Sequence, residues 1–240
     1  VVVGTVLVYS LIARPLAKRL DLTQKHPQGT LIVGAHHWAR QIAAAIQEAG
    51  IDVWLVDTNG RHIENATNAG LNAFQDSIMA DGILDDLPLE CTGRLLAITD
   101  NSELNALAAV RFSEWFGGKN VFQLVSGKAG EPQYITEGLR GRLLFGEDMT
   151  FKELEKQYFR GSQVELIKEN AYEAVTSYVK KGVPVVVLFV ITEDGRLRVS
   201  TADKPRMPEG NEGAIILREP VDDLQPATGS SGALQMPVTI

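Results

Sequence analysis

The sequence predicts an α/β protein in which a doubly wound parallel sheet is followed by a smaller α+β unit. Short apolar runs alternate with helical segments over residues 30–127, which is typical of a parallel sheet with helices on both faces. An acidic residue, Asp57, stands 23 residues after Gly34, the spacing of a β-α-β unit. Further on, Asp194-Gly195 joins two strand-like runs, which indicates a β-hairpin in the second part.

Residues 30–59 contain one complete β-α-β unit. The apolar run at residues 31–33 meets Gly34, and the helix that follows stops at Gly50. The apolar face of that helix consists of Ile42, Ala43, Ile46 and Ala49. A second apolar run, residues 53–56, ends on Asp57. This order is that of a Rossmann-like dinucleotide fold.

The residues around the first turn indicate a ligand that carries a phosphate and a ribose. Gly34 allows a sharp turn, so that the first N–H groups of the helix face a phosphate where the helix dipole is positive. Asp57 can accept hydrogen bonds from a ribose diol, with Asn59 just beyond it; the alternative is a plain exposed acid at a strand end. The pattern G-x-G-x-x-G is incomplete, because His36 and Ala39 replace its later glycines. The expected ligand is an adenine nucleotide, with NAD, AMP and ATP left open.

More polar residues follow strand ends on the same carboxyl edge of the predicted sheet. Asp76 follows a short strand at residues 72–74, and Thr99 and Asp100 follow a buried strand at residues 94–99. Ligands bind along that edge in doubly wound folds. The alternatives are that Asp76 only ends its strand, and that Asp100 or Ser102 only caps the next helix.

The adjacent histidines His36 and His37 raise the question of a metal site. Neighbouring residues at a helix start point in different directions, and no Glu or Cys stands at ligand spacing, so loop histidines without a metal are favoured. One of them could instead donate to a phosphate or sense pH. Trp38 is favoured as a packing residue. No G-x-S-x-G elbow, Walker lysine loop or paired-carboxylate motif is present, so no catalytic residue is predicted.

Composition limits the class of protein. The chain has 240 residues and a formal net charge of −7, and the acidic balance is spread along its length. This distribution argues against nucleic-acid binding, which needs a concentrated basic face. The single cysteine, Cys91, excludes a disulfide framework and favours a reducing, cytosolic setting. Cys91 itself is favoured as a buried small side chain over a nucleophile.

The two ends of the chain differ from the rest. Residues 1–13 carry no charge and are followed by Arg14, Lys18 and Arg19. The run is shorter than the ~20 residues that span a bilayer, and its charges follow it, opposite to a secretory signal. Residues 1–22 therefore fit the cytoplasmic end of a transmembrane helix, the alternative being a buried N-terminal helix. Residues 21–29 are predicted as a linker and residues 223–240 as a mobile tail.

The second half is predicted to begin after a glycine- and proline-containing break at residues 127–132. The first domain thus covers residues 29–127 and the second residues 133–222. Expected elements of the second domain are strands at residues 141–145, 163–167 and 214–217, helices at 151–159 and 172–181, and the hairpin around Asp194.

Five segments carry a family resemblance: GAHHWAR, LVDTN, RLLAITDNSELNALAA, VFQLVSG and LRGRLLFG. In this order they closely resemble the cytoplasmic tail of bacterial cation:proton antiporters of the sodium/proton exchanger type. The first half resembles the TrkA amino-terminal (TrkA-N) domain, the nucleotide-binding domain of the regulator-of-potassium-conductance (RCK) class. Residues 1–20 resemble the end of the last transmembrane helix, and VPVVVLFVITEDGRLRV with MPEGNEGAIIL resembles the smaller regulatory domain. The family's Gly-Asp-Ala-Thr is Gln75-Asp76-Ser77-Ile78 here, so that only the aspartate carries over.

The resemblance implies a non-enzymatic regulatory domain on the cytoplasmic face of the inner membrane. It would form a homodimer, partner its own transmembrane antiporter domain, and gate sodium or potassium/proton exchange through nucleotide or ion occupancy. The ligand residues carried over are Gly34, Asp57, Asp76 and Asp100. Rival interpretations are a soluble NAD-dependent oxidoreductase and a purely structural dimerisation domain.

The predicted dimer interface is the helix that contains residues 106–115. Its large apolar side chains are Leu107, Val110, Trp115 and Phe116, and Trp115 or Phe116 is expected near the centre of the interface. The alternative is that these side chains only cover the sheet of their own subunit.

Overall fold

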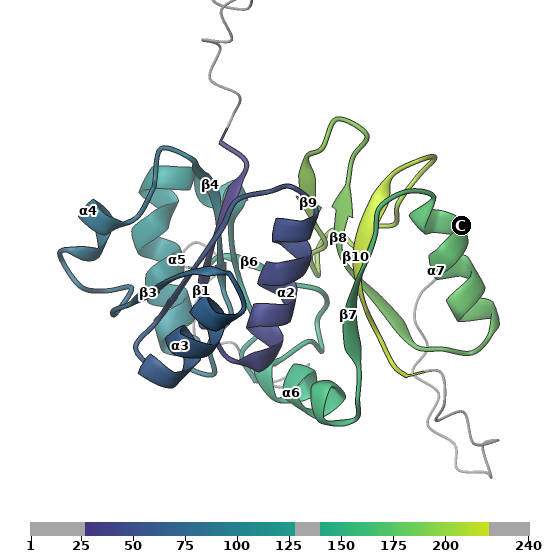
Figure 1. Cartoon of the computed structure of the whole chain (residues 1–240), viewed down its shortest axis with the longest axis horizontal. Helices are drawn as coiled ribbons and strands as arrows, with labels where there is room; N and C mark the ends of the chain where they lie inside the picture. Colours follow the sequence, from purple (N-terminus) through teal and green to yellow (C-terminus); the bar gives the residue numbers. More distant parts are fainter. Residues whose placement is uncertain (1–26, 128–139, 221–240) are drawn as a thin grey trace, which may run out of the picture.

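The computed structural model describes residues 27–127 and 140–220, and its first sheet is the predicted parallel one (Figure 1). The six strands lie in the order β3-β2-β1-β4-β5-β6, and every neighbouring pair is parallel. The strands are β1 (Gly29–Val33), β2 (Val53–Asp57), β3 (Asn72–Gln75), β4 (Thr92–Ala97), β5 (Val121–Gln123) and β6 (Arg142–Leu143). The helices between them are α2 (His37–Glu48), α3 (Gly60–Asn68), α4 (Ile83–Asp86) and α5 (Ser102–Phe116). The prediction of an α/β, doubly wound, Rossmann-like fold is confirmed.

Helices cover both faces of this sheet because its central strands are apolar on both sides. In β1, Ile32 faces one hydrophobic core, whereas Leu31 and Val33 face another. Helix α2 packs into the first core and α5 into the second, so the two helices lie on opposite sides of the sheet (Figure 1). The alternation follows from the two-residue period of a strand.

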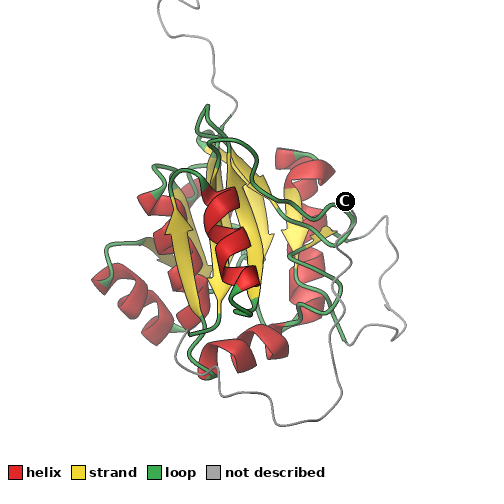
Figure 2. Ribbon diagram, turned by 90° about the vertical axis from the view of Figure 1, so that its right-hand side faces the viewer, coloured by secondary structure: helices red, strands yellow, loops and turns green. Residues whose placement is uncertain are grey.

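The second sheet is antiparallel and has the order β7-β10-β8-β9 (Figure 1). Figure 2 views the molecule from the side of this sheet. Its strands are β7 (Gln163–Ile167), β8 (Val185–Ile191), β9 (Leu197–Val199) and β10 (Gly213–Arg218), and its helices are α6 (Phe151–Phe159) and α7 (Ala171–Lys180). The predicted hairpin is confirmed: β8 pairs with β9, and Gly195 in the turn has φ +76°, a conformation that favours glycine.

Helix α2 lies between the two sheets, and the two halves share one core (Figure 1). That core joins Ile42 and Ile46 of α2 to Leu188 and Phe189 of β8, and all four are at most 1% exposed. Helix α7 covers the outer face of the second sheet, with Val175 in a third cluster. The molecule is therefore layered as α5, first sheet, α2, second sheet and α7.

Several expectations need correction. The strand expected at residues 141–145 in the second domain is β6, and it pairs with β5 in the first sheet. Helix α5 is capped by Asn101, whose side chain accepts from the N–H of Leu104 at 2.8 Å, and not by Asp100 or Ser102. Cys91 is exposed rather than buried. The domain division itself stays a prediction, because residues 128–139 lie outside the described part.

The predicted dimer helix has the expected apolar surface, with one exception. Leu107, Val110 and Trp115 of α5 are 54%, 43% and 57% exposed. Phe116 is only 9% exposed and stacks on Phe112 at 5.8 Å between ring centroids. The ring of Phe116 thus belongs to its own subunit's core, and the predicted interface, which remains a prediction, is left with Trp115 as its aromatic residue.

The predictions for residues 1–22 and 223–240 concern segments outside the described residues. In residues 27–127 and 140–220, the helices are too short or too polar for any of them to cross a membrane.

Candidate functional site

The candidate site lies at the carboxyl edge of three neighbouring strands, β2, β1 and β4. Gly34 follows β1 with φ +108°, a conformation that a side chain would strain. Its N–H donates to Val56 of β2 at 2.8 Å, while the N–H of Ile98, after β4, donates to Val33 at 3.0 Å. The loop from Gly34 into α2, residues 34–37, thus starts from a fixed point at the centre of the sheet.

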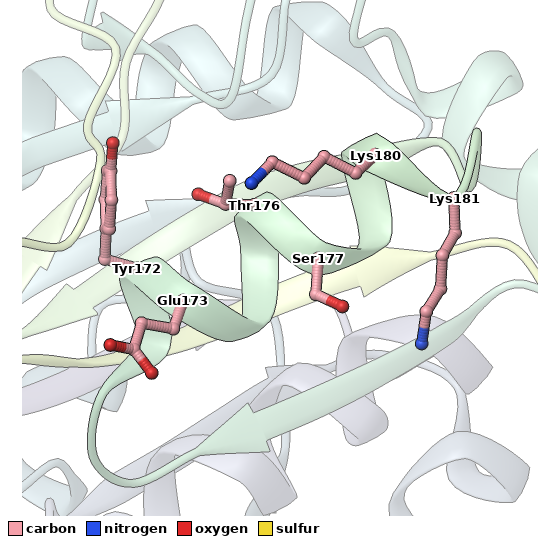
Figure 3. A pocket seen from close by; sticks show the side chains of 6 residues that line it. All are labelled: Tyr172, Glu173, Thr176, Ser177, Lys180 and Lys181. Carbon is pink, nitrogen blue, oxygen red and sulfur yellow. The ribbon is translucent and has the colours of Figure 1, made fainter.

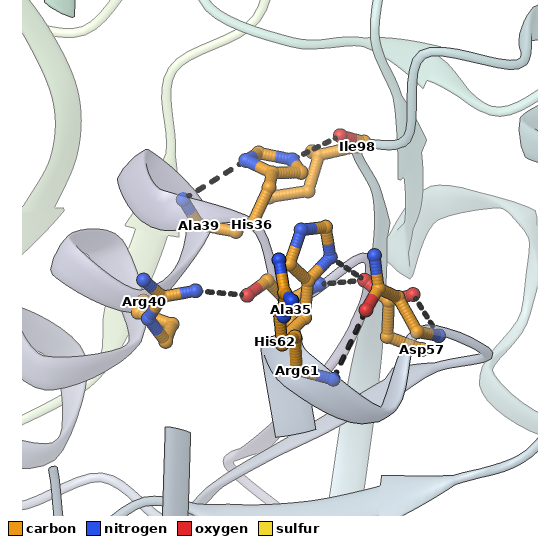
Figure 4. A network of polar contacts seen from close by, with 9 residues as sticks. Ala35, His36, Ala39, Arg40, Asp57, Arg61, His62 and Ile98 are labelled. Atoms are coloured by element: carbon orange, nitrogen blue, oxygen red, sulfur yellow. Dashed lines mark hydrogen bonds and ion pairs between the residues drawn. The ribbon is translucent and has the colours of Figure 1, made fainter. Parts of the chain in front are cut away.

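The imidazole of His36 occupies the start of α2 (Figure 4). Its Nε2 lies 2.9 Å from the carbonyl oxygen of Ile98, which can only accept, so Nε2 carries the proton. Nδ1 is then free to accept from the N–H of Ala39 at 3.4 Å, which makes His36 the N-cap of α2. Burial lowers the pKa of His36 to about 4, so the ring is neutral at pH 7. At the start of α2, where a phosphate would bind, the N–H of Ala39 therefore already has this ring as its acceptor.

The carboxylate of Asp57 holds the loop together (Figure 4). It accepts from the N–H of Ala35 at 2.7 Å, from the N–H of Asn59 at 2.9 Å and from Nδ1 of His62 at 2.9 Å. Burial raises the pKa of Asp57, but the hydrogen bonds from these three groups outweigh it and hold the pKa below its usual value. Asp57 is thus an ionised acceptor whose partners come from both sides of the predicted ribose position.

Arg40 binds the loop at the carbonyl group of Ala35. Its guanidinium donates to the carbonyl oxygen of Ala35 at 2.6 Å (Figure 4). This contact places a cation one turn into α2, beside the residue whose N–H is bound by Asp57. The loop backbone is therefore held at Ala35 from two directions.

The same loop contacts the second half of the chain through α6. The ring of His36 meets Phe151 edge-on with centroids 5.0 Å apart, and Trp38 lies 5.6 Å from Phe151. His37 stacks against Tyr158 at 4.4 Å, with the hydroxyl 2.9 Å from Nε2. Burial, together with the nearby Arg40, lowers the pKa of His37. Trp38 is 5% exposed, so its prediction as a packing residue is confirmed.

Some of the predicted ligand residues come together in the structure, and the others do not. Gly34, His36 and Asp57 come together around Ala35, and Asn59 joins them through its N–H while its side chain caps α3. His37 turns away to α6.

Three predicted residues stay outside this network. Thr99 bonds through Oγ1 to Asn105 of α5 at 2.7 Å, which fixes the turn after β4. Asp76 accepts from the N–H of its neighbour Ser77, and Asp100 is exposed. In the part of the chain that the structure describes, neither Asp76 nor Asp100 is hydrogen-bonded to the group around Ala35.

Sequence reasoning missed His62, Arg40 and the two aromatic residues of α6. A signal for His62 existed: it is the third residue of α3, the position whose side chain commonly reaches back over a helix start. Tyr158 is 121 residues from His37, and no spacing rule connects them.

A first cavity lies away from this network. A depression of about 400 Å³ runs along the outer face of α7, and all its lining side chains belong to that helix and its C-cap (Figure 3). It brings together Tyr172, Glu173, Lys180 and Lys181 with two hydroxyl side chains, without a buried polar group. We therefore place the candidate site at residues 34–37, on hydrogen-bond geometry. Within the described ranges, no three His, Cys, Asp or Glu side chains gather as a metal site would require.

Comparison with known proteins gives one family match. Residues 30–136 match the family model of the TrkA-N domain, which confirms the predicted resemblance for that segment. The rest of the resemblance, to an antiporter tail, lies outside this match. No curated protein sequence matches the chain.

Solved structures with a related arrangement share little sequence. The NAD(P)-binding domain of an exopolyphosphatase-related protein from Archaeoglobus fulgidus is 17% identical over 56% of this chain and 96% of that chain, with a TM-score of 0.43. UDP-glucose 4-epimerase from Thermotoga maritima is 14% identical over 55% and 49%, with a TM-score of 0.37. The GsuK RCK domain is 9% identical over 80% and 44%, with a TM-score of 0.34. This chain thus spans about half the length of the last two, and similarity at this level transfers neither ligand nor activity.

Proposed function

We propose that this chain is a non-enzymatic, ligand-sensing regulatory domain of a membrane cation:proton antiporter. In this proposal it forms a homodimer on the cytoplasmic face of the inner membrane and gates sodium or potassium/proton exchange. The TrkA-N match over residues 30–136 supports the sensing half. One observation carries the proposal. The loop at residues 34–37, which is suited to a phosphate, also contacts α6 through His36 and His37.

The proposed ligand is an adenine nucleotide that displaces groups already in the site. Its phosphate takes the place of the His36 ring at the start of α2, where the N–H of Ala39 and the helix dipole favour an anion. Its ribose hydroxyls exchange with His62 as donors to Asp57. Arg40 supplies a cation beside the phosphate. The His36 ring, which caps α2, thus acts as a gate: it has to move before the phosphate can bind at this helix start.

The gate is coupled to the second half of the chain. A His36 ring that turns out of the phosphate position also gives up its edge-on contact with Phe151. Nucleotide occupancy therefore weakens the attachment of α6. A ligand shifts such an equilibrium only through different affinities for the two states, and coupling free energies of about 1–3 kcal/mol are typical.

Titration calorimetry of the purified chain with NAD, AMP and ATP tests this proposal. At least one nucleotide is expected to bind, and Asp57→Ala is expected to weaken that binding by about 1–3 kcal/mol, because a ribose hydroxyl loses its acceptor. Asp76→Ala is the matched control: Asp76 directly follows the neighbouring strand β3 and, among the described residues, accepts a hydrogen bond from Ser77, so its loss should leave affinity unchanged. Far-UV circular dichroism confirms that both variants are folded.

The rival interpretations give different results. Turnover of a nicotinamide substrate, followed by absorbance, would identify a soluble NAD-dependent oxidoreductase. A stable dimer that binds none of the three nucleotides would identify a purely structural dimerisation domain. Equal weakening by Asp57→Ala and Asp76→Ala would move the ligand away from Asp57.

A further inference from the structure

A second cavity, of about 210 Å³, lies at the edge of the antiparallel sheet and is lined by cations. Arg198 comes from β9, while Lys204 and Arg206 come from the segment that follows it. Val190 of β8 forms an apolar wall. This cavity shares no lining residue with the network around Asp57.

The backbone holds these cations in place. Lys204 exchanges two backbone hydrogen bonds with Thr201, at 3.1 and 3.3 Å. The N–H of Arg206 donates to the hydroxyl of Ser200 at 3.1 Å, and Ser200 is 3% exposed. Both charged side chains therefore start from a fixed turn rather than from a free loop.

The carboxylates in the cavity do not account for all of this positive charge. Glu212 accepts from the N–H of Glu209 at 3.0 Å and lies 3.7 Å from a nitrogen of Arg198, so it is already engaged. Within residues 27–127 and 140–220, no ion pair is formed by Lys204 or Arg206. Of the carboxylates that line the cavity, Glu209 is the one left to oppose these two cations, which leaves an excess of positive charge.

Arg206 carries the strongest indication of a missing partner. Its Nε is buried and has no acceptor in the described part of the chain. Buried donors are almost always paired in native proteins, and a charged donor without a partner is the most costly kind. An acceptor from outside the chain would satisfy it.

We propose that this cavity binds a phosphate group. Arginine presents a planar set of donors that matches phosphate oxygens, and lysine adds a point charge. Three cations and two carboxylates line the cavity, and a phosphate offers these cations more acceptor oxygens than a carboxylate does. The cavity has room for one phosphate and not for a whole nucleotide, since pockets for drug-sized ligands begin at about 300 Å³.

Nuclear magnetic resonance of the full 240-residue chain tests the site directly, through the Nε–H signal of Arg206. Inorganic phosphate should shift this signal saturably, while chloride at matched ionic strength should not. Lys204→Gln should weaken the binding ~10-fold, the effect of losing one charge-assisted contact. Lys181→Gln, which removes a cation from the depression on α7, is the matched control and should leave affinity unchanged. Arg198→Gln, measured at the same signal, is a second variant should Lys204→Gln fold poorly.

Flotation with phosphatidylcholine vesicles, with and without phosphatidic acid, identifies the source of the phosphate. Binding that needs phosphatidic acid and is lost in Lys204→Gln assigns a lipid headgroup; phosphate binding without flotation assigns a soluble ligand. An Arg206 signal that does not respond to either source, or equal weakening by Lys204→Gln and Lys181→Gln, would overturn the proposal.

Discussion

At the scale of single residues, the site depends on what replaces glycine in the turn after β1. A glycine at position 36 would leave the start of α2 open to a phosphate, whereas His36 fills it and donates to Ile98. The same replacement, together with Trp38, creates the contact with Phe151. The residue that replaces glycine, His36, is therefore also a residue that attaches α6 to the loop.

Removal of the His36 ring should tighten nucleotide binding. Each of its two hydrogen bonds contributes about 0.5–1.5 kcal/mol, and a ligand no longer has to break them. His36→Gly should therefore raise the affinity for the bound nucleotide by roughly 5- to 100-fold in calorimetry, since glycine at an N-cap costs little helix stability. His37→Gly is the control because His37 faces Tyr158. An affinity that falls in His36→Gly would show that the imidazole contacts the ligand instead of excluding it.

Acid should destabilise the fold through His36. Its pKa is about 4 in the folded state and 6.5 in the unfolded state, so between these values the unfolded chain binds the extra proton. The contribution of neutral His36 to the free energy of unfolding is thus fully present above pH 6.5 and is lost as pH falls toward 4. Between pH 7 and pH 5 the free energy of unfolding should fall by up to about 2 kcal/mol from this group. His36→Asn, which can still cap the helix, should make the free energy of unfolding, measured with urea, depend less on pH. An unchanged pH dependence would show that other groups cause it.

At the scale of secondary-structure elements, helix α5 offers the exposed apolar side chains expected of a dimer interface. Trp115, 57% exposed, is its largest one, and aromatic anchors concentrate binding energy. Trp115→Asp should weaken a homodimer at least ~10-fold by light scattering at micromolar concentration. Val179→Asp on α7, at a position 60% exposed, is the matched control. A chain that is monomeric without any substitution would contradict the prediction.

The sequence predicted elements better than it predicted contacts between them. Helix α6 was predicted with its observed ends because its segment is amphipathic, and the β1–α2–β2 unit because its spacing is local. The contact between α6 and the loop could not be predicted, since His37 and Tyr158 are 121 residues apart. Strand β6 was assigned to the wrong sheet for a related reason: two paired residues carry too little pattern to choose a sheet.

At the scale of the whole molecule, one core joins the two sheets through α2, so both halves should unfold together. All three tryptophans lie in the first half, whereas circular dichroism reports on both halves. The two signals should therefore give a single coincident urea transition. Leu188→Ala, at a fully buried position of β8, should lower stability by about 2–5 kcal/mol and shift both signals equally. Two separate transitions would show that the halves are independent domains.

A buried arginine also links distant parts of the chain. Arg94 of β4 donates to the carbonyl oxygen of Leu197 in β9 at 2.6 Å and to the side chain of Gln28 at 2.9 Å. Burial lowers its pKa to about 10, so the guanidinium keeps its charge at neutral pH. Arg94 therefore connects β9 of the second sheet with Gln28, the residue directly before β1 of the first sheet.

Hydrogen–deuterium exchange of the chain with and without its bound nucleotide tests the coupling between the start of α2 and α6. In the proposed coupling, a ligand at the start of α2 displaces His36 from Phe151 and thereby loosens α6. Saturating nucleotide should protect the amides of residues 34–40 and speed exchange in α6, while exchange in α7 should stay unchanged. Protection of α6, or an α6 that does not respond while residues 34–40 become protected, would contradict it.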